Sequence, residues 1–406
     1  MEKFGLIGRT LKHSYSKTIH NLLGDYEYEL YELEPNELAD FVKSKKLKAF
    51  NVTIPYKKDV MPYLDRIDQS AKFIGSVNTI VNNNGVLTGY NTDFKGMVYM
   101  LNRAGIEVKG KKVMILGSGG TCNTAISVVK YLGARYILVV SRSGEVNYDN
   151  YLEYNDAEII INTTPVGMYP NNYDCPIDLS TFNKLCGVVD VIYNPNTTML
   201  SLYAKEKGVK YTNGLPMLVA QAKYAYEYFF NARIGDGVID ELLKRLLKDT
   251  LNVVLVGMPG SGKSTVGKVL AKELGFDFVD IDELVVEREK RDIPTIFEQS
   301  GEQYFRQIES QVIKEVSKKT RTVIATGGGA VKDKQNYFAL KSNGTIFWLD
   351  RQIESLATVG RPLSKDLSAL RQLFEQRKDL YQAFADYKID NNGKVHQTIK
   401  EVIEKL

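Results

Sequence analysis

Residues 251–271, LNVVLVGMPGSGKSTVGKVLA, predict the fold of the C-terminal part of this chain. An apolar run indicates a buried strand, a glycine-rich loop follows it, and a helical pattern comes next. The loop matches G-x-x-x-x-G-K-[ST] in the strand–loop–helix context that this pattern requires. Backbone N–H groups of such a loop surround phosphates, its lysine reaches the β and γ oxygens, and its serine can bind Mg²⁺. We therefore expect a domain that binds a nucleoside triphosphate and Mg²⁺ through Gly260, Ser261, Gly262, Lys263, Ser264 and Thr265.

A second strand, glycine loop and helix begin at Lys111, in KKVMILGSGGTCNTAISVV. Its GSGG segment fits the first two glycine positions of a dinucleotide-binding turn, and Cys122 replaces the last small residue. The helix expected over 121–132 would offer its N-terminal N–H groups to a pyrophosphate. Arg142 follows the next strand, where NAD enzymes usually carry an acidic residue, and it therefore favours the 2′-phosphate of NADP. A tight turn and a solvated arginine are the alternative interpretations of these two features.

The composition narrows the class of protein. The chain has 406 residues, enough for two or three compact units. Its net charge of +4 is spread along the chain, so we expect no nucleic-acid partner. No apolar run approaches the ~18 residues of a membrane span, and the N-terminus lacks a signal-peptide pattern. Three cysteines without metal-ligand spacing suggest a reducing compartment, so we expect a cytoplasmic protein. A homo-oligomer is compatible with the sequence.

The first 95 residues alternate short strands with helical patterns, which predicts a mostly parallel sheet with helices packed on it. Polar side chains follow several of the expected strands. They are Ser14, Ser16, Thr53, Lys57, Asn78 and Asp93. Hydroxyls, an amide, a lysine and a carboxylate together suit a small polyhydroxylated acid. A Lys–Asp pair can also move the proton that accompanies hydride transfer to a ketone. Taken singly, each residue is more typical of a turn or a loop cap.

The polar residues after the phosphate loop of residues 257–264 indicate which molecule accepts the phosphoryl group. Asp280 and Asp282 stand two apart at an expected strand end, so they are predicted to share a face. One could support Mg²⁺ while the other holds or deprotonates an acceptor hydroxyl. Arg306 and Arg377 are expected on helices, and Arg361 in a polar loop. A triple-glycine turn follows the buried strand before residue 327.

The first 245 residues resemble shikimate dehydrogenase. The motifs that carry the resemblance are LKHSYS, NVTIPYK, GSVNT, NTDFKG, GSGGT, NTTPVGM, DVIYNPNTTML and NGLPMLVAQA, in this order. The resemblance implies that NADPH reduces 3-dehydroshikimate to shikimate, with Lys57 and Asp93 as the catalytic pair. The implied substrate residues are Ser14, Ser16, Thr53, Asn78, Asp93, Tyr193 and Gln221. The implied cofactor residues are Gly117, Ser118, Gly119, Gly120, Thr121, Arg142, Val191 and Gly214.

Three features depart from this family's pattern. Lys17 stands where the family usually has a proline, and SRS replaces the commoner Asn-Arg-Thr. The segment from Ser143 to Asn155 is also too short for the helix expected there.

The chain from about residue 251 onward resembles shikimate kinase. The spacing of the DID, FR, GGG and RPL segments favours this family over similar small kinases for gluconate or nucleotides. The resemblance implies that Asp282 orients or deprotonates the attacking hydroxyl, which leaves Asp280 with Ser264 for Mg²⁺. It implies that shikimate is held by Asp282, Arg306, Gly328 and Arg377, and that Arg361 comes from a lid over ATP. This lid region is short and lacks the second arginine that many members carry.

The sequence thus predicts an α/β chain of two enzymes. Residues 1–245 would be the dehydrogenase, with 1–100 and 215–245 binding the substrate and 101–214 forming a Rossmann NADP-binding part. Residues 251–406 would be a P-loop kinase with a parallel sheet, which converts shikimate to shikimate 3-phosphate. Two alternatives stay open: an NAD-dependent quinate/shikimate dehydrogenase fused to the kinase, or one half kept as a non-catalytic binding module.

Overall fold

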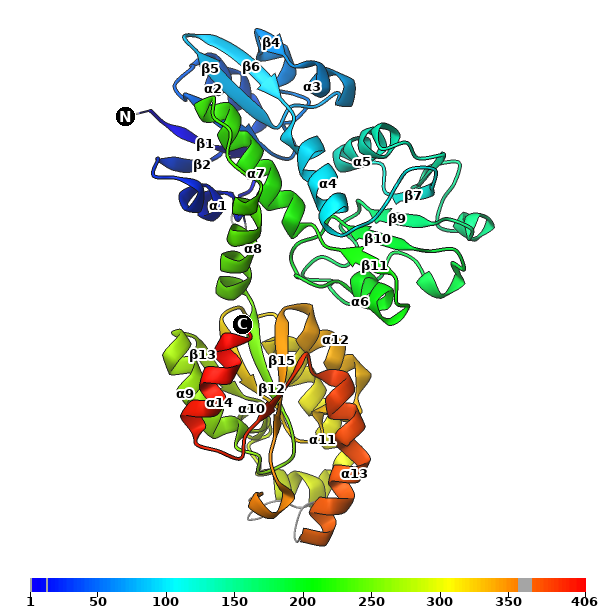
Figure 1. Cartoon of the computed structure of the whole chain (residues 1–406), viewed down its shortest axis with the longest axis vertical. Coiled ribbons are helices and arrows are strands. Elements are labelled where there is room, and N and C mark those ends of the chain that lie inside the picture. Colours follow the sequence, from blue (N-terminus) through cyan, green and yellow to red (C-terminus); the bar gives the residue numbers. More distant parts are fainter. Residues whose placement is uncertain (1, 12–13, 357–366) are drawn as a thin grey trace. The chain divides into compact units, whose positions relative to one another are not determined.

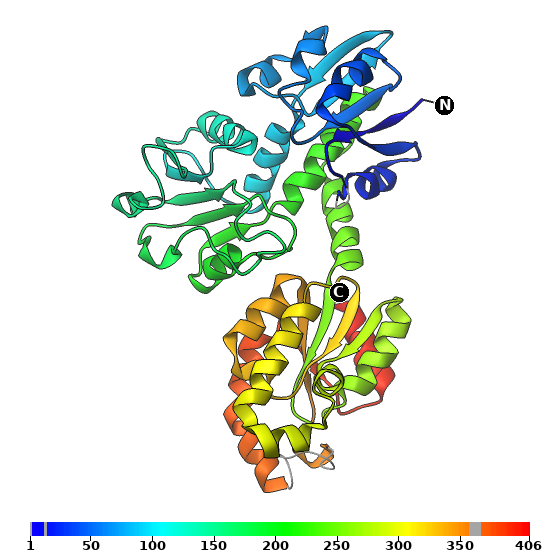
Figure 2. The same cartoon turned by 180° about the vertical axis from the view of Figure 1, so that it is seen from behind.

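A computed structural model of the chain describes residues 2–11, 14–356 and 367–406. The chain divides into two compact units (Figures 1 and 2). Residues Met1–Asn194 and Thr198–Arg245 form the first unit, and Leu246–Leu406 with Pro195–Thr197 form the second. No helix in the described part of the chain is both long and apolar enough to cross a membrane.

The first sheet of the first unit has six strands in the order β2-β1-β3-β5-β6-β4. Its strands are β1 (Phe4–Gly8), β2 (Tyr28–Glu32), β3 (Ala49–Val52), β4 (Arg66–Ile67), β5 (Thr79–Asn83) and β6 (Val86–Tyr90). Its short helices are α1 (Ser16–Leu23), α2 (Leu38–Lys43) and α3 (Gln69–Ile74). Strands β1, β2 and β3 pair in parallel, and β1 and β3 are buried along their whole length.

This sheet is mixed, because β5 runs antiparallel to both β3 and β6. The sequence prediction of a mostly parallel sheet overlooked the hairpin between β5 and β6. Asn84 and Gly85 form its two-residue turn, and both have positive φ values, 51° and 88°. Asn-Gly is the residue pair that such a turn prefers, so the signal was present in the sequence.

The second sheet of the first unit has five parallel strands in the order β11-β10-β9-β7-β8. The strands are β7 (Lys112–Leu116), β8 (Tyr136–Val140), β9 (Ile159–Asn162), β10 (Gly187–Asp190) and β11 (Lys210–Thr212). Helices α5 (Gly120–Tyr131) and α6 (Met199–Glu206) belong to it. The strand order reverses between β7 and β9, and ligands of such sheets bind beyond the strand ends at this point.

The short segment after β8 contains no α-helix, as the sequence predicted. It holds only a 3₁₀ turn, Tyr151–Tyr154, before β9 begins. Two long helices lie side by side between the two sheets of this unit, α4 (Thr92–Arg103) and α7 (Leu215–Phe230) (Figures 1 and 2). Helix α8 (Gly237–Thr250) follows, and the boundary between the two units along the chain falls within it.

The second unit has one sheet of five parallel strands in the order β13-β14-β12-β15-β16. The strands are β12 (Asn252–Val256), β13 (Asp277–Asp280), β14 (Thr322–Ala325), β15 (Gly344–Asp350) and β16 (Tyr387–Asp390). The helices are α9 (Lys263–Leu274), α10 (Ile281–Glu289), α11 (Ile293–Val316), α12 (Lys334–Ser342), α13 (Leu367–Phe384) and α14 (Val395–Glu404). Central strands β12 and β14 are fully buried, as expected when helices cover both faces of a parallel sheet.

Candidate active sites

Lys57 and Asp93 meet in the first unit. Lys57 lies in the loop after β3, and Asp93 lies in the first turn of α4. The Lys57 Nζ donates a hydrogen bond to Asp93 Oδ2 at 2.6 Å. The lysine side chain is 26% exposed and the aspartate side chain 12%, so the pair is half-enclosed and still open to a ligand. The structure thus brings together two residues that are 36 positions apart in the sequence.

A buried polar network holds the start of α4, and with it Asp93. Asn78 is 2% exposed, and its Oδ1 accepts a hydrogen bond from the Thr92 backbone N–H at 2.7 Å. Its Nδ2 donates to Thr92 Oγ1 at 3.0 Å. Asn51 extends the network by donating to the Asn78 carbonyl at 3.2 Å, and accepts from the Tyr28 hydroxyl at 2.8 Å. Asn51 and Tyr28 are not among the residues expected from the sequence.

The remaining expected substrate residues come from separate segments. Ser14 Oγ accepts a hydrogen bond from the Ser16 backbone N–H at 3.2 Å, where α1 begins. The Thr53 N–H donates to the Ile7 carbonyl, which fixes the loop after β3 to β1. Tyr193 follows β10, and its ring lies 5.6 Å from that of Tyr15. Gln221 lies on α7 and donates to the Leu218 carbonyl of its own helix at 3.0 Å.

The glycine loop of residues 117–120 lies at the carboxyl end of β7, where the strand order reverses. Gly119 is the N-cap of α5, and its flanking residues Ser118 and Gly120 are exposed. A Cβ placed on Gly119 or Gly120 would meet no other atom within 4 Å. The helix N-terminus is therefore open to an anion, as a pyrophosphate site requires. Thr121 is partly buried at the start of α5, and Gly117 has a φ of +103° in the turn itself.

Arg142, Val191 and Gly214 follow other strands of the same sheet. Arg142 is exposed two residues beyond the end of β8. A Cβ on Gly214 would lie 2.0 Å from the Val191 carbonyl oxygen, so no larger residue fits without moving the backbone. The Gly214 N–H donates to the Ile192 carbonyl at 2.9 Å, which ties the start of α7 to the loop after β10.

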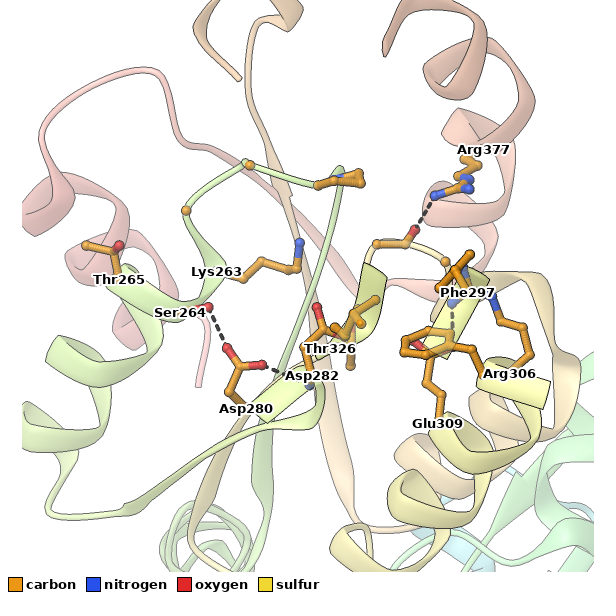
Figure 3. Close-up of a pocket in the computed structure, with 18 of the residues that line it drawn as sticks. Lys263, Ser264, Thr265, Asp280, Asp282, Phe297, Arg306, Glu309, Thr326 and Arg377 are labelled. Atoms are coloured by element: carbon orange, nitrogen blue, oxygen red, sulfur yellow. Dashed lines mark hydrogen bonds and ion pairs between the residues drawn. The ribbon is translucent and has the colours of Figure 1, made fainter. Parts of the chain in front are cut away.

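In the second unit, a cavity of about 560 Å³ opens beside the phosphate loop of residues 257–264 (Figure 3). Ten of its lining residues were expected from the sequence, namely Gly260, Gly262, Lys263, Ser264, Thr265, Asp280, Asp282, Arg306, Gly328 and Arg377. They come from the loop after β12, from α9, β13, α10, α11 and α13, and from the turn after β14. The size suits a small-molecule ligand.

Lys263 begins α9 and is 8% exposed. Its Nζ donates to the carbonyls of Gly257 and Met258, each at 2.9 Å. The ammonium therefore lies against its own loop, where a phosphate would be surrounded by the loop's N–H groups. Ser261, also expected in this set, is fully buried in the loop and is not among the lining residues.

Ser264 and Asp280 form an oxygen-rich pair on one side of the cavity (Figure 3). The Ser264 hydroxyl donates to Asp280 Oδ2 at 2.5 Å, and Asp280 Oδ1 accepts from the Asp282 N–H at 3.0 Å. A hydroxyl and a carboxylate next to phosphate oxygens suit Mg²⁺, which binds few protein ligands and keeps several waters. Within the described ranges, no group of three or more His, Cys, Asp and Glu side chains is placed to hold a metal ion.

The prediction that Asp280 and Asp282 share a strand face was wrong. Strand β13 ends at Asp280, which is the N-cap of α10, and Asp282 lies in the first turn of that helix. Strand alternation therefore stops between them. Both carboxylates still reach the same cavity, because the cap bond folds the helix start back toward Asp280.

Two arginines converge on the triple-glycine turn from different helices. Arg306 on α11 lies so close to this turn that a Cβ on Gly329 would be 2.2 Å from its Nη2. Arg377 on α13 is 4% exposed, and its Nη1 donates to the Gly328 carbonyl at 3.0 Å. The Tyr381 hydroxyl donates to the same carbonyl at 2.5 Å. Two guanidinium groups on one wall can bind a carboxylate.

Glu309 is a site residue that was not expected from the sequence. It is fully buried, and its Oε2 accepts from Arg306 Nη1 at 2.6 Å. Burial raises its pKa to about 7, although the charge of Arg306 opposes that shift. A Cβ on Gly327 would lie 2.3 Å from Glu309 Oε1 and 2.8 Å from Asp282 Oδ1, so glycine is required where the two carboxylates approach this turn. The spacing of three residues after Arg306 on one helix was the available signal.

Other lining residues were also missed, mostly because they are apolar. They are Pro259, Ile293, Phe297, Phe305, Thr326, Gly327, Gly329 and Arg351. The ring centroids of Phe297 and Phe305 lie 5.0 Å apart with the planes tilted by 43°, and the two rings form an aromatic wall beside Arg306. Arg361, expected in a lid, lies outside the described residues.

Two family models match the chain. One, described as shikimate dehydrogenase substrate binding domain, matches residues 6–80. The other, described as shikimate kinase, matches residues 259–406. The matches fall on the Lys57 loop in the first unit and on the cavity of the second.

Curated relatives and solved structures are similar to the N-terminal part. The NADP⁺ shikimate dehydrogenase of Caldanaerobacter subterraneus is 37% identical over 250 residues, which are 55% of this chain and 89% of that protein. The Clostridium beijerinckii enzyme of the same name is 39% identical over 58% of this chain and 94% of its own length. A chorismate mutase/shikimate 5-dehydrogenase fusion protein from Clostridium acetobutylicum matches with a TM-score of 0.58 and 37% identity, over 61% of this chain and 97% of that one. A Thermus thermophilus shikimate 5-dehydrogenase in complex with NADP(H) and shikimate matches with a TM-score of 0.55 and 26% identity, over 60% of this chain and 99% of that one.

Proposed function

Because the chain belongs to the shikimate dehydrogenase family in its N-terminal part and carries a shikimate kinase domain in its C-terminal part, we propose that its two sites act in succession on one small acid. The chain is a bifunctional enzyme of the shikimate pathway, with NADP(H), ATP and Mg²⁺ as cofactors. The Lys57–Asp93 contact carries the assignment of the first site, and the cavity around Lys263 carries that of the second. We propose residues 1–245 and 251–406 as the two functional domains.

The proposed dehydrogenase site reduces the ketone of 3-dehydroshikimate to the hydroxyl of shikimate. The loop Gly117–Thr121 would hold NADPH, which would supply the hydride for the ketone carbon. The Lys57 ammonium donates the proton that the ketone oxygen takes up, and Asp93 orients that ammonium at 2.6 Å. Ser14, Ser16, Thr53, Tyr193 and Gln221 are proposed to hold the carboxylate and hydroxyls. Asn78 is proposed to act at the same site, although both ends of its amide already bond to Thr92.

The proposed kinase site transfers the terminal phosphoryl group of ATP to shikimate. Ser264 and Asp280 would hold Mg²⁺, which would neutralise charge on the phosphates. Lys263 contacts the β and γ oxygens, and Asp282 orients or deprotonates the attacking hydroxyl. Arg306 and Arg377 bind the substrate carboxylate at the turn that contains Gly328. The observation that carries this assignment is that cations, carboxylates and phosphate loop line one cavity.

A sequential assay tests the function directly. The purified chain receives 3-dehydroshikimate and NADPH, and the fall in NADPH absorbance is followed. MgATP is then added, and shikimate 3-phosphate is measured by mass spectrometry. We expect NADPH oxidation in the first step and the phosphorylated product only in the second. Absence of either product would contradict the corresponding half of the assignment.

Replacing Arg142 with alanine is expected to weaken NADPH more than NADH. The guanidinium would lose a charge-assisted contact with the 2′-phosphate, which NADH does not carry. We expect the KM for NADPH to rise by about 10-fold or more, with the KM for NADH nearly unchanged. Arg135→Ala is the matched control, since Arg135 is also exposed but precedes β8 at the opposite end. An unchanged KM for NADPH would contradict the role of Arg142.

Replacing Glu309 with glutamine is expected to remove a pH-dependent loss of stability. Because burial raises the pKa of Glu309 from 4.5 to about 7, the folded state binds this proton more tightly than the unfolded state. The resulting stabilisation is complete below pH 4.5 and is lost as the pH rises to about 7. The side-chain amide of the Glu309→Gln variant does not titrate in this range. The unfolding free energy of the variant relative to wild type should therefore rise between pH 5 and pH 8, by up to about 3 kcal/mol.

Urea unfolding followed by tryptophan fluorescence measures this difference. Trp348 is the single tryptophan of the chain, lies in β15 and is 4% exposed, so its fluorescence reports the second unit alone. Glu315→Gln is the matched control on the same helix, because that carboxylate is 63% exposed. A stability difference that does not vary with pH would show that Glu309 titrates as it does in the unfolded chain.

A further inference from the structure

Arg351 is a cationic residue of the kinase cavity that the family motifs do not assign. It is the first residue after β15 and is half-buried in the cavity wall. A Cβ placed on Gly262 of the phosphate loop would lie 3.5 Å from Arg351 Nη1. Its Nε is enclosed by protein and has no hydrogen-bond partner, and no carboxylate among the described residues forms an ion pair with its guanidinium. A guanidinium in this state can bind an anionic ligand.

The order of the strands decides which part of the nucleotide faces Arg351. Strand β12 is central and leads into the phosphate loop. On one side of it, Asp282 and Gly328 follow β13 and β14 and belong to the proposed acceptor site. Arg351 and Asn391 follow β15 and β16 on the other side. In-line transfer requires the γ-phosphate to point toward the acceptor. The α-phosphate and the adenosine must therefore extend toward β15 and β16.

The neighbours of Arg351 on this side already have partners. Asn391 Nδ2 donates to the Ser261 carbonyl at 2.5 Å, so its amide supports the phosphate loop. Lys388 pairs with Asp350 at 2.9 Å and lies over the Trp348 ring at 4.5 Å. On the β15–β16 side of the phosphate loop, Arg351 is therefore a cation that faces the loop and forms no ion pair with a carboxylate of the described residues.

We propose that Arg351 binds the α-phosphate of ATP and of the product ADP. This role rests on the proposed kinase function and adds a nucleotide-affinity residue to it. The guanidinium lies beside the loop whose backbone N–H groups surround the phosphates, so its charge adds to theirs on the side away from the acceptor. Because the α-phosphate does not react, Arg351 contributes equally to ATP and ADP binding and leaves the acceptor site unchanged.

The test uses the full chain with Arg351→Ala and Arg351→Lys, and calorimetric titration with MgADP. We expect the Kd for MgADP and the KM for ATP to rise together by about 10-fold in the alanine variant. The lysine variant should recover most of that affinity, because a lysine ammonium keeps the charge and binds phosphate as a point charge. The KM for shikimate and the dehydrogenase activity of the same molecules should stay at wild-type values. Arg371→Ala is the matched control, since Arg371 is 65% exposed and pairs with Glu354.

Each other outcome overturns the role. An unchanged Kd for MgADP would mean that Arg351 does not touch the nucleotide. A lysine variant as weak as the alanine variant would indicate planar stacking on the adenine ring rather than a phosphate contact. A wild-type chain that binds no MgADP and phosphorylates no shikimate would refute the kinase function itself, before any variant is compared.

Discussion

Replacing Lys57 with methionine is expected to abolish the reduction of 3-dehydroshikimate while shikimate phosphorylation continues at the wild-type rate. Methionine keeps the length of the side chain and removes the ammonium that donates the proton. General acid catalysis by a positioned side chain contributes about 10²- to 10⁴-fold, so we expect a loss of that order in kcat. The KM should change less, because several other side chains are proposed to bind the substrate.

The neighbouring residue offers a matched control for this experiment. Lys58→Met removes the same charge one position along the chain, from an exposed side chain that makes no contact with Asp93. We expect this variant to keep full dehydrogenase activity. Both activities are measured on the same preparation, so that the kinase activity serves as an internal reference. Thermal unfolding of the first unit then detects a folding defect that is confined to that unit. Retained reduction in a folded Lys57→Met protein would show that another group supplies the proton.

Replacing the partner carboxylate separates positioning from proton donation. Asp93→Asn keeps a hydrogen-bond acceptor at 2.6 Å from Lys57 but removes the negative charge. A smaller loss than in Lys57→Met is expected if Asp93 mainly orients the ammonium. Comparing the loss of kcat in the two variants therefore shows how much Lys57 and Asp93 each contribute to the reduction.

The local features of this chain could be predicted because short segments determine them. The phosphate loop needs only a strand, a fixed glycine spacing and a helix, all within residues 251–271. The arginines of α11 and α13 were correctly placed on helices, since helical periodicity is also local. Family motifs then joined these pieces into two enzymes, and the family comparisons confirm that assignment.

The site residues that were missed depend mostly on contacts between distant segments of the chain. Glu309 was missed because its role comes mainly from burial against Arg306 and from the approach of Gly327, 18 positions later, and the helical spacing from Arg306 alone did not show either. Arg351 was missed because only the strand order puts the end of β15 beside the loop after β12. The error on Asp280 and Asp282 had a different cause: strand periodicity was extended across a helix cap. The hairpin at Asn84 was a local signal that the alternating strand–helix pattern obscured.

Replacing Lys263 with methionine is expected to abolish phosphoryl transfer and to leave dehydrogenase activity intact. The ammonium is held at 2.9 Å from two carbonyls of its own loop, so it is positioned before any phosphate binds. Such a preorganised cation stabilises charge on the transferred group without having to reorganise. Loss of one donor to a developing charge costs about 10²- to 10³-fold in kcat, and we expect at least that here.

The control for this variant lies on the same helix. Lys268→Met removes an equal charge from an α9 side chain that is 58% exposed and pairs only weakly with Glu283 at 3.3 Å. We expect full kinase activity in that protein. Trp348 fluorescence during urea unfolding checks that the Lys263→Met unit remains folded. Loss of the dehydrogenase as well, in a folded protein, would contradict two separate sites, because Lys263 lies in the phosphate loop of the second unit and the Lys57–Asp93 pair lies in the first.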